Sequence, residues 1–142
     1  MLKQSDVISA VSEFLKSHGY TISEGLPLTA KRGNVILVKD SLPPEIYIEA
    51  QGETSSQKNS KKFGKPFSNS QIRIRVARVF LYSAEILSKR GSNQEVGVGI
   101  ALPDKTYHTC VDQIRPTLKK LGIYVFWVDK SKKVKVDLQW KL

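Results

Sequence analysis

The sequence of 142 residues has a single cysteine, Cys110, and no long hydrophobic run. One cysteine cannot form an internal disulfide bond, so the count fits the reducing environment of the cytoplasm. No apolar stretch approaches the roughly 18 residues that a transmembrane helix needs, and the N-terminus lacks the apolar segment of a signal peptide. We therefore expect a soluble, cytoplasmic protein with one domain over residues 1–142, since this length suits a single hydrophobic core.

The sequence also lacks the motifs of several enzyme classes. It contains no Walker loop and no GxSxG nucleophile elbow. Gly97 and Gly99 occur inside an expected strand, which is the wrong context for a dinucleotide-binding loop. His108 and Cys110 are two positions apart on an expected helix and point to different sides of it. Without a second cluster of His or Cys, this spacing argues against a zinc site and against a Cys–His nucleophilic pair.

Acidic residues are scarce relative to basic ones, with 13 Asp and Glu against 23 Lys and Arg and a formal charge of +10. The excess is concentrated between residues 58 and 90, where nine basic residues and one acid, Glu85, give +8 and leave +2 for the rest of the chain. A basic region on a nearly neutral body is typical of a protein that binds a polyanion. The alternative is a solvated surface that only keeps the protein soluble.

The spacing of the apolar residues predicts an α/β fold. A first helix is expected to begin at Ser5, whose side chain can cap it, and to end at His18. Two further helices are expected at 68–90, capped by Ser68 or Ser70, and at 104–121. Strands are expected at 20–23, 35–39, 45–51, 95–102, 123–129 and 134–139. The order is α-β-β-β-α-β-α-β-β, which predicts a mixed sheet flanked by helices, with the lysine-bearing last strand at an edge.

The strand at 45–51 and the segments after it carry the polar residues of most interest. Alternation places Ile46, Ile48 and Ala50 on one face and Glu45, Tyr47, Glu49 and Gln51 on the other. A long polar loop at 52–67 follows, and loops of this length are usually functional or mobile. The helix at 68–90 then has an apolar stripe for the core, while Gln71, Arg75, Arg78 and Tyr82 lie on a different side.

An acid-bearing strand, a lysine-rich loop and an arginine-rich helix in this order resemble the PD-(D/E)XK, or restriction-endonuclease-like, nuclease superfamily. The run IEAQGETSS at 48–56 is similar to the third strand of its small resolvase-like members, and GNVILV at 33–38 occurs where those relatives carry a strand-opening acid. GVGIALPD and LGIYVFWVD are similar to the closing strand–helix–strand of the family. The resemblance covers most of residues 5–129 and implies a restriction-endonuclease-like core.

In this family two acids hold a divalent metal, usually Mg²⁺ with Mn²⁺ as a substitute, and a lysine orients the attacking water. The resemblance assigns Glu49 to the second acid, Asn34 to the first acid and Gln51 to the lysine, so these three are the expected catalytic residues and Glu49 and Asn34 the expected metal ligands. Asn34 lacks a negative charge, and Gln51 cannot supply a cation. Acids that could replace the missing one are Asp40, Glu13 and Glu24.

The basic residues around this strand are expected to contact the phosphates of a nucleic acid. They are Lys58, Lys61, Lys62, Lys65, Arg73, Arg75 and Arg78. The first hypothesis for function is a metal-dependent DNA endonuclease, and the second is a DNA-binding relative that keeps the fold without cleavage. A third is a subunit whose basic patch meets an acidic protein partner. The sequence leaves open RNA in place of DNA, and a homodimer as the assembly.

Overall fold

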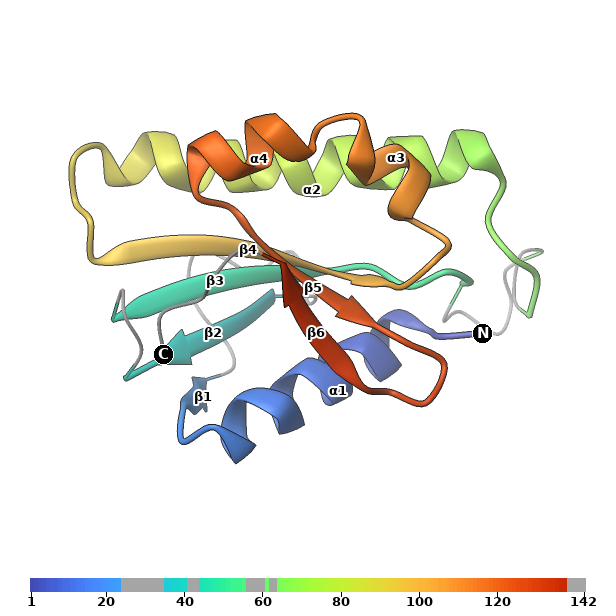
Figure 1. Cartoon of the computed structure of the whole chain (residues 1–142), viewed down its shortest axis with the longest axis horizontal. Coiled ribbons are helices and arrows are strands. Elements are labelled where there is room, and N and C mark those ends of the chain that lie inside the picture. The colour runs from blue at the N-terminus through green and yellow to red at the C-terminus, as the bar shows by residue number, and fades with distance from the viewer. Residues whose placement is uncertain (24–34, 41–43, 56–60, 62–63, 138–142) are drawn as a thin grey trace.

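A six-stranded mixed sheet forms the centre of the protein, with its strands in the order β1-β2-β3-β4-β5-β6. The computed structural model describes residues 1–23, 35–40, 44–55, 61 and 64–137. Helix α1 lies against one face of the sheet, and α2, α3 and α4 lie against the other (Figure 1). The mixed sheet between helices is the predicted restriction-endonuclease-like architecture.

The elements follow one another in the predicted order, except that one predicted helix is divided into two. The helices are α1 (Gln4–Ser17), α2 (Asn69–Arg90), α3 (His108–Asp112) and α4 (Arg115–Leu121). The strands are β1 (Thr21–Ser23), β2 (Val35–Lys39), β3 (Glu45–Ala50), β4 (Val96–Pro103), β5 (Tyr124–Val128) and β6 (Val134–Asp137). Among the described residues no helix is both long enough and apolar enough to cross a membrane.

The pairing of the strands determines which loops meet. Strands β1, β2 and β3 form an antiparallel meander, β3, β4 and β5 run parallel, and β6 returns antiparallel to β5. The chain therefore leaves β3, β4 and β5 at the same end, which we call the carboxyl end of the sheet. The N-terminus and the β5–β6 hairpin also lie at this end, on the right of Figure 1. Ligand sites in sheets with parallel strands form outside such carboxyl ends.

The two faces of the sheet have separate apolar clusters. Ile46 and Ile48 of β3 pack with α1, whereas Tyr47 of the same strand packs with α2. The predicted apolar stripe of α2 is confirmed, because its inward positions are buried: Ile72, Val76, Val79, Ser83 and Ile86. Burying an aliphatic side chain of this size contributes about 1.5–3 kcal/mol, so the stripe holds α2 in place above the sheet.

Two predicted helix boundaries are wrong. The single helix predicted at 104–121 is two helices, because Pro116 lies in the first turn of α4 and its ring would clash with the carbonyl of Asp112 in a continuous helix. The first helix begins after Lys3 instead of at Ser5, and the Asp6 carboxylate accepts the Lys3 backbone N–H at 2.8 Å. For α2 the structure selects Ser68 as the cap, with a reciprocal contact to Gln71.

Candidate nucleic-acid interface

Arg75 and Gln51 join the helix α2 to the carboxyl end of β3. Gln51 is 2% exposed, and its backbone N–H continues the pairing with β4 by donating to the Ala101 carbonyl at 3.0 Å. Arg75 Nη1 donates to Gln51 Oε1 at 2.9 Å, and its guanidinium lies over the ring of Phe67, 3.8 Å from the centroid. Stacking and hydrogen bonding together restrict the guanidinium to one position. Gln51 therefore orients a cation.

Glu49 lies on the same face of the sheet as Gln51 and Arg75. Side chains alternate along a strand, and Ile48 and Ala50 belong to the α1 cluster while Tyr47 belongs to the α2 cluster. Glu49 shares the face of Tyr47, which is the face that the sequence predicted for it. The side chain is 1% exposed, so it is buried beneath the helix layer and not part of an open polar surface. A carboxylate at such depth is uncommon outside functional or hydrogen-bonded sites.

The chain after Gln51 is fixed by contacts to three other segments. Glu53 accepts the Leu2 backbone N–H on one carboxylate oxygen at 2.7 Å and the Thr106 hydroxyl on the other at 2.6 Å. The Tyr107 hydroxyl donates to the Gly52 carbonyl at 2.6 Å. Phe67, whose ring carries Arg75, donates its backbone N–H to the Glu53 carbonyl at 3.0 Å. These bonds position the carboxyl end of β3 and the Phe67 ring on which the Arg75 guanidinium stacks.

Gly52 permits the N-terminus to cross this segment. A Cβ at position 52 would lie 2.4 Å from the Gln4 backbone nitrogen and 2.7 Å from the Lys3 carbonyl carbon, closer than any side chain tolerates. Gln4 Nε2 donates to the Ala50 carbonyl at 3.0 Å beside this crossing. Sequence patterns alone indicated no role for Gly52, Glu53, Thr106 or Tyr107. The acid at Glu53 and the glycine before it were visible in the sequence, but their partners come from distant segments.

Burial and neighbouring charges shift the pKa values of two members of this cluster. Burial lowers the pKa of the Arg75 guanidinium, Tyr107 raises it, and the positive charge of Arg78 lowers it further. Burial also raises the pKa of the Tyr107 hydroxyl well above its ordinary value, which keeps this donor to Gly52 protonated. Arg78 is three positions after Arg75 on α2, so the two arginines are neighbours on the surface of the helix.

The predicted phosphate-contacting residues occupy different places. Lys61, Lys65 and Arg78 are exposed, and the Lys65 carbonyl accepts the Thr54 hydroxyl at 2.7 Å, which ties that part of the loop to the end of β3. Arg73 is exposed on the opposite flank of α2, where it lines a cavity with Cys110 and Gln113 of the α3 region. Lys58 and Lys62 lie outside the described residues. Arg78 thus lies one turn from Arg75 on α2, and the Lys65 backbone is bound to the segment that follows β3, whereas Arg73 lies on another side of the helix.

The acids considered as replacements for the missing one do not join Glu49 in the described part of the chain. Asp40 follows Lys39, which pairs with Glu45 at the other end of β3, and its carboxylate accepts the Thr21 hydroxyl at 2.8 Å. Asn34 and Glu24 lie outside the described residues. Val35, which follows Asn34 in the sequence, is the register partner of Glu49.

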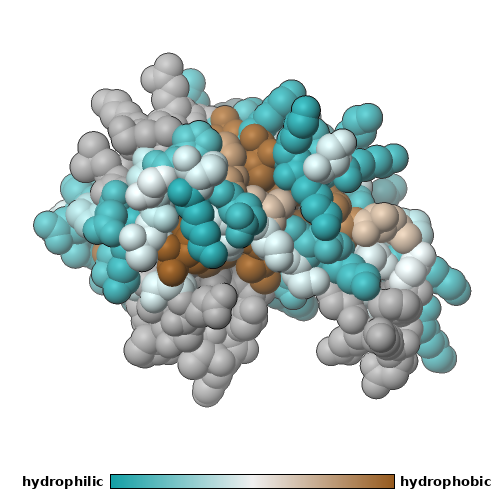
Figure 2. Space-filling model, turned by 90° about the horizontal axis from the view of Figure 1, so that it is seen from below, coloured by the Kyte–Doolittle hydropathy of each residue, from teal (hydrophilic) through white to brown (hydrophobic). Residues whose placement is uncertain are grey.

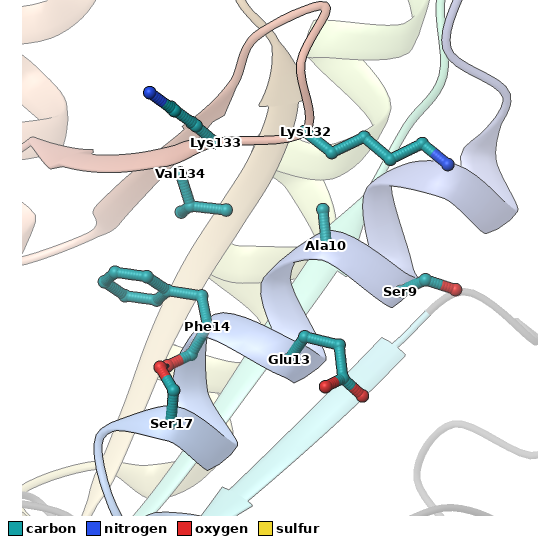
Figure 3. A pocket seen from close by; sticks show the side chains of 8 residues that line it. All are labelled: Ser9, Ala10, Glu13, Phe14, Ser17, Lys132, Lys133 and Val134. Atoms are coloured by element: carbon teal, nitrogen blue, oxygen red, sulfur yellow. Dashed lines mark hydrogen bonds between the residues drawn. The ribbon is translucent and has the colours of Figure 1, made fainter.

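Glu13 lies on the other side of the sheet. It lines a cavity of about 670 Å³ between α1 and the β5–β6 hairpin, together with Phe14, Lys132 and Lys133 (Figure 3). Helix α1 covers the face opposite to that of Glu49, so Glu13 cannot complete a site with it. The surface on the α1 side shows hydrophobic residues only in patches among hydrophilic ones (Figure 2).

The described residues do not make up a complete magnesium site. They contain no group of three or more His, Cys, Asp or Glu side chains arranged to hold an ion. Both carboxylate oxygens of Glu53 already accept hydrogen bonds from Leu2 and Thr106. Mg²⁺ is usually bound through one or two carboxylates in near-octahedral geometry, and Glu49 provides one. A hydrolytic step through a metal therefore cannot be derived from these residues.

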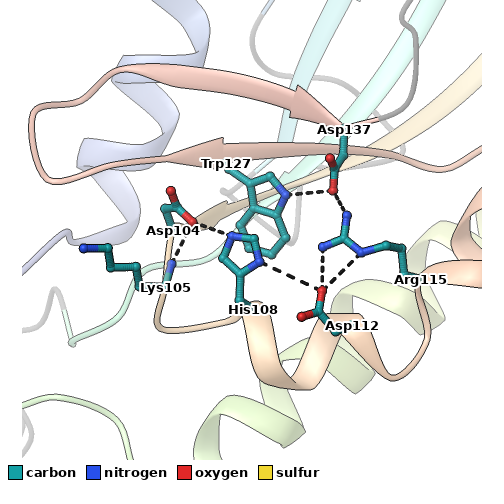
Figure 4. Close-up of polar contacts among 7 residues, drawn as sticks. All are labelled: Asp104, Lys105, His108, Asp112, Arg115, Trp127 and Asp137. Atoms are coloured by element: carbon teal, nitrogen blue, oxygen red, sulfur yellow. Dashed lines mark hydrogen bonds and ion pairs between the residues drawn. The ribbon is translucent and has the colours of Figure 1, made fainter.

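A second polar network braces the far side of the same helix layer. His108 stacks on Trp127 with ring centroids 3.9 Å apart and contacts Asp104 (Figure 4). Trp127 Nε1 donates to Asp137 at 3.0 Å, and Arg115 links Asp137 to Asp112. The network connects α3 and α4 to β5 and β6. His108 thus packs against the sheet, and the Trp127 side chain is buried in the core.

Comparison with known proteins supports the fold. No protein-family model and no curated protein sequence matches this chain. Two solved structures are similar to it over almost their whole length. One is an XisH family protein from Nostoc punctiforme PCC 73102, with a TM-score of 0.55, 14% identity, and 95% of this chain and 98% of that chain covered. The other is a fdxN element excision controlling factor protein from Anabaena variabilis, with a TM-score of 0.56, 15% identity, and coverages of 96% and 98%. At this identity the likeness establishes a shared fold, the restriction-endonuclease-like core expected from the sequence.

Proposed function

We propose that this protein binds DNA at the carboxyl end of its sheet, with Arg75 as the central phosphate contact. The observation that carries the proposal is the placement of Arg75, which Phe67 and Gln51 hold at the end of β3. An arginine fixed in this way loses little side-chain freedom on binding a phosphate, to which it can donate two hydrogen bonds. Arg78, one turn further along α2, and Lys65, whose carbonyl accepts the Thr54 hydroxyl after β3, add exposed positive charge at this end of the sheet.

Two further observations support a polyanion, and DNA in particular, as the partner. The charge of +10 includes +8 between residues 58 and 90, the segment that contains these cations. One of the structures similar to this chain is an excision controlling factor of the fdxN element, and excision of an element is a process on DNA. DNA is therefore the polyanion we propose.

The test is the salt dependence of duplex binding, measured by fluorescence anisotropy. Each phosphate contact contributes about 0.9 to the slope of log affinity against log salt concentration. Arg75→Gln should lower the affinity and reduce the slope by about 0.9. The matched control is Lys89→Gln, an equal loss of charge on the same helix. Lys89 is 14 residues from Arg75, or about 21 Å along the helix axis. Negligible binding by the wild type at low salt, or equal effects of both substitutions, would refute the proposal.

The second candidate function is metal-dependent cleavage of DNA, which the burial of Glu49 on the α2 face favours. With Mg²⁺ or Mn²⁺ this candidate predicts nicking of plasmid DNA that Glu49→Gln abolishes. Glutamine has nearly the same volume, so the substitution removes the charge without leaving a cavity, and circular dichroism should confirm that the variant is folded. A wild-type protein that binds duplex DNA but does not nick it with either metal eliminates cleavage and leaves the binding proposal intact.

A further inference from the structure

The β5–β6 hairpin presents three lysines on a rigid turn. Its turn contains Lys130, Lys132 and Lys133, and all three are exposed. Asp129 Oδ1 accepts the backbone N–H groups of Ser131 at 2.8 Å and Lys133 at 2.9 Å. The Asp129 carbonyl also accepts the Lys132 backbone N–H at 2.9 Å, and the Asp129 backbone N–H donates to the Lys133 carbonyl at 3.0 Å. The Asp129 side chain therefore bonds the backbone of the turn, whereas the three lysines remain exposed. Lys132 Nζ lies 3.8 Å from Asp6 Oδ1 of α1, and Lys132 and Lys133 border the cavity beside α1.

This turn lies at the same end of the sheet as Arg75. The Asp104 backbone N–H donates to the Val128 carbonyl at 2.7 Å, which fixes the base of the hairpin to the end of β4. The Gln51 backbone N–H donates in the same way to the carbonyl of Ala101, which lies on β4 three residues before Asp104. Neighbouring strands are about 4.8 Å apart, so the hairpin base on β5 begins about 10 Å from the line of β3.

Lys105 directly follows Asp104 in the sequence. It lies just beyond the carboxyl end of β4, the strand between β3 and β5. It is exposed and has a positive φ of 68°, a conformation that non-glycine residues adopt infrequently. Asp104 Oδ1 accepts the Lys105 backbone N–H at 2.8 Å and contacts His108, so this acid also faces the protein. Each of the three parallel strands therefore has cations near its carboxyl end: Arg75 and Lys65 near β3, Lys105 after β4, and the hairpin lysines after β5.

The described residues at the carboxyl end of the sheet expose no aromatic ring on which an unpaired base could stack. Proteins that bind single strands stack bases on exposed aromatic rings. At the carboxyl end Phe67, Tyr107 and Trp127 are buried, and the exposed large apolar side chains in the described part of the chain are Met1, Ile74, Leu81 and Leu121, none of them aromatic. A backbone-contacting mode of binding fits this surface better than base stacking.

We propose that the β5–β6 hairpin is a second phosphate-contacting element and that the bound nucleic acid is a duplex lying across the ends of β3, β4 and β5. The separation of about 10 Å between β3 and β5 is close to the major-groove width of about 12 Å in B-DNA. Cations beside β3 and on the hairpin can then contact the two backbones that border one groove. This inference rests on the proposed DNA binding and specifies its substrate class.

The test compares two triple variants of the full chain that lose the same charge. The first is Lys130→Gln, Lys132→Gln and Lys133→Gln in the hairpin. The control is Lys89→Gln, Lys119→Gln and Lys120→Gln, three exposed lysines that precede β4 and β5 at the other end of the sheet. Binding of a 20-base-pair duplex and of its single strand would be measured over a salt series for both variants and the wild type.

The hairpin variant should bind the duplex at least tenfold more weakly, with the salt slope reduced by about 2 to 3 for two or three lost contacts. The control should change duplex affinity less than threefold, and the hairpin variant should change single-strand affinity less than duplex affinity. If the wild type binds the duplex but both variants weaken it equally, the hairpin proposal fails and DNA binding stands. Equal losses for duplex and single strand overturn the duplex assignment. Failure of the wild type to bind either probe refutes the proposed function itself.

Discussion

Arg75 on α2 and Gln51 at the end of β3 share a hydrogen bond of 2.9 Å, although 24 residues separate them in the sequence. The resemblance to nucleases assigned Gln51 to the position of a lysine, whose cation it cannot provide. The contact places an arginine guanidinium against that amide. The positive charge at this end of β3 therefore comes from the following helix.

Changing Gln51 to Lys should destabilise the fold. The new ammonium group would lie beside the Arg75 guanidinium in a buried site, and like charges at that distance repel. We expect a loss of about 1 to 3 kcal/mol in the free energy of unfolding, much of which should be recovered when Arg75→Gln is added. Urea denaturation of the four proteins of this double-mutant cycle measures the coupling. Strictly additive effects would show that the two side chains do not interact.

Glu53 should be essential for stability and not for DNA contact. Its carboxylate accepts bonds from Leu2 and Thr106, and removing it leaves two donors without their acceptor. We expect Glu53→Ala to cost about 3 kcal/mol, since hydrogen bonds to charged groups contribute about 1.5–3 kcal/mol each and are not additive. Glu95→Ala, the loss of an exposed carboxylate, should stay within about 0.5 kcal/mol of the wild type. Equal stability of the two variants in urea would contradict this role.

A methyl group at position 52 should displace the start of α1. The obstacles to a Cβ there are backbone atoms of Lys3 and Gln4, which cannot rotate away. At Gly99 the nearest obstacle is the Phe126 ring at 3.1 Å, a side chain that can adjust. We expect Gly52→Ala to lose at least about 2 kcal/mol and Gly99→Ala to lose less, in line with the usual costs of overpacking. Thermal unfolding of both variants tests the order, and a reversed order would be inconsistent with the crossing.

The layers of this fold were predictable because they follow from periodicity. The stripe of α2 and the alternation of β3 are enough to assign Glu49 to the α2 face, and Glu49 does lie there. The division of 104–121 was harder to predict, because the apolar spacing on both sides of Pro116 is that of one helix. The partners of Glu53 and Gly52 were not predictable, because Leu2 and Thr106 reach them through tertiary packing that local patterns do not encode.

Stability should decline in alkaline solution partly through Tyr107. Burial raises the pKa of this hydroxyl above its ordinary value of 10.0, so the unfolded chain releases the proton first as the pH rises. The stabilisation is complete below about pH 10 and is lost above it, at up to about 1.4 kcal/mol per pH unit. Because Tyr107→Phe removes the hydrogen bond to the Gly52 carbonyl, it should lower the free energy of unfolding by about 1 kcal/mol at pH 7. Between pH 10 and 11 the free energy of unfolding of this variant should decline less steeply than that of the wild type. Urea denaturation at a series of pH values measures both proteins. If their free energies of unfolding decline in parallel above pH 10, Tyr107 makes no such contribution.

The most direct test of the proposed interface is an NMR titration of the ¹⁵N-labelled protein with a 20-base-pair duplex at low salt. Binding at the carboxyl end of the sheet predicts that amide shifts concentrate at residues 51–55, 104–105 and 129–133, and that the Arg75 side-chain Nε signal moves with them. Lys89, Lys119 and Lys120 at the opposite end should be little affected. Shifts centred on those three lysines, with residues 51–55, 104–105 and 129–133 unaffected, would contradict the central claim that DNA binds at the carboxyl end of the sheet.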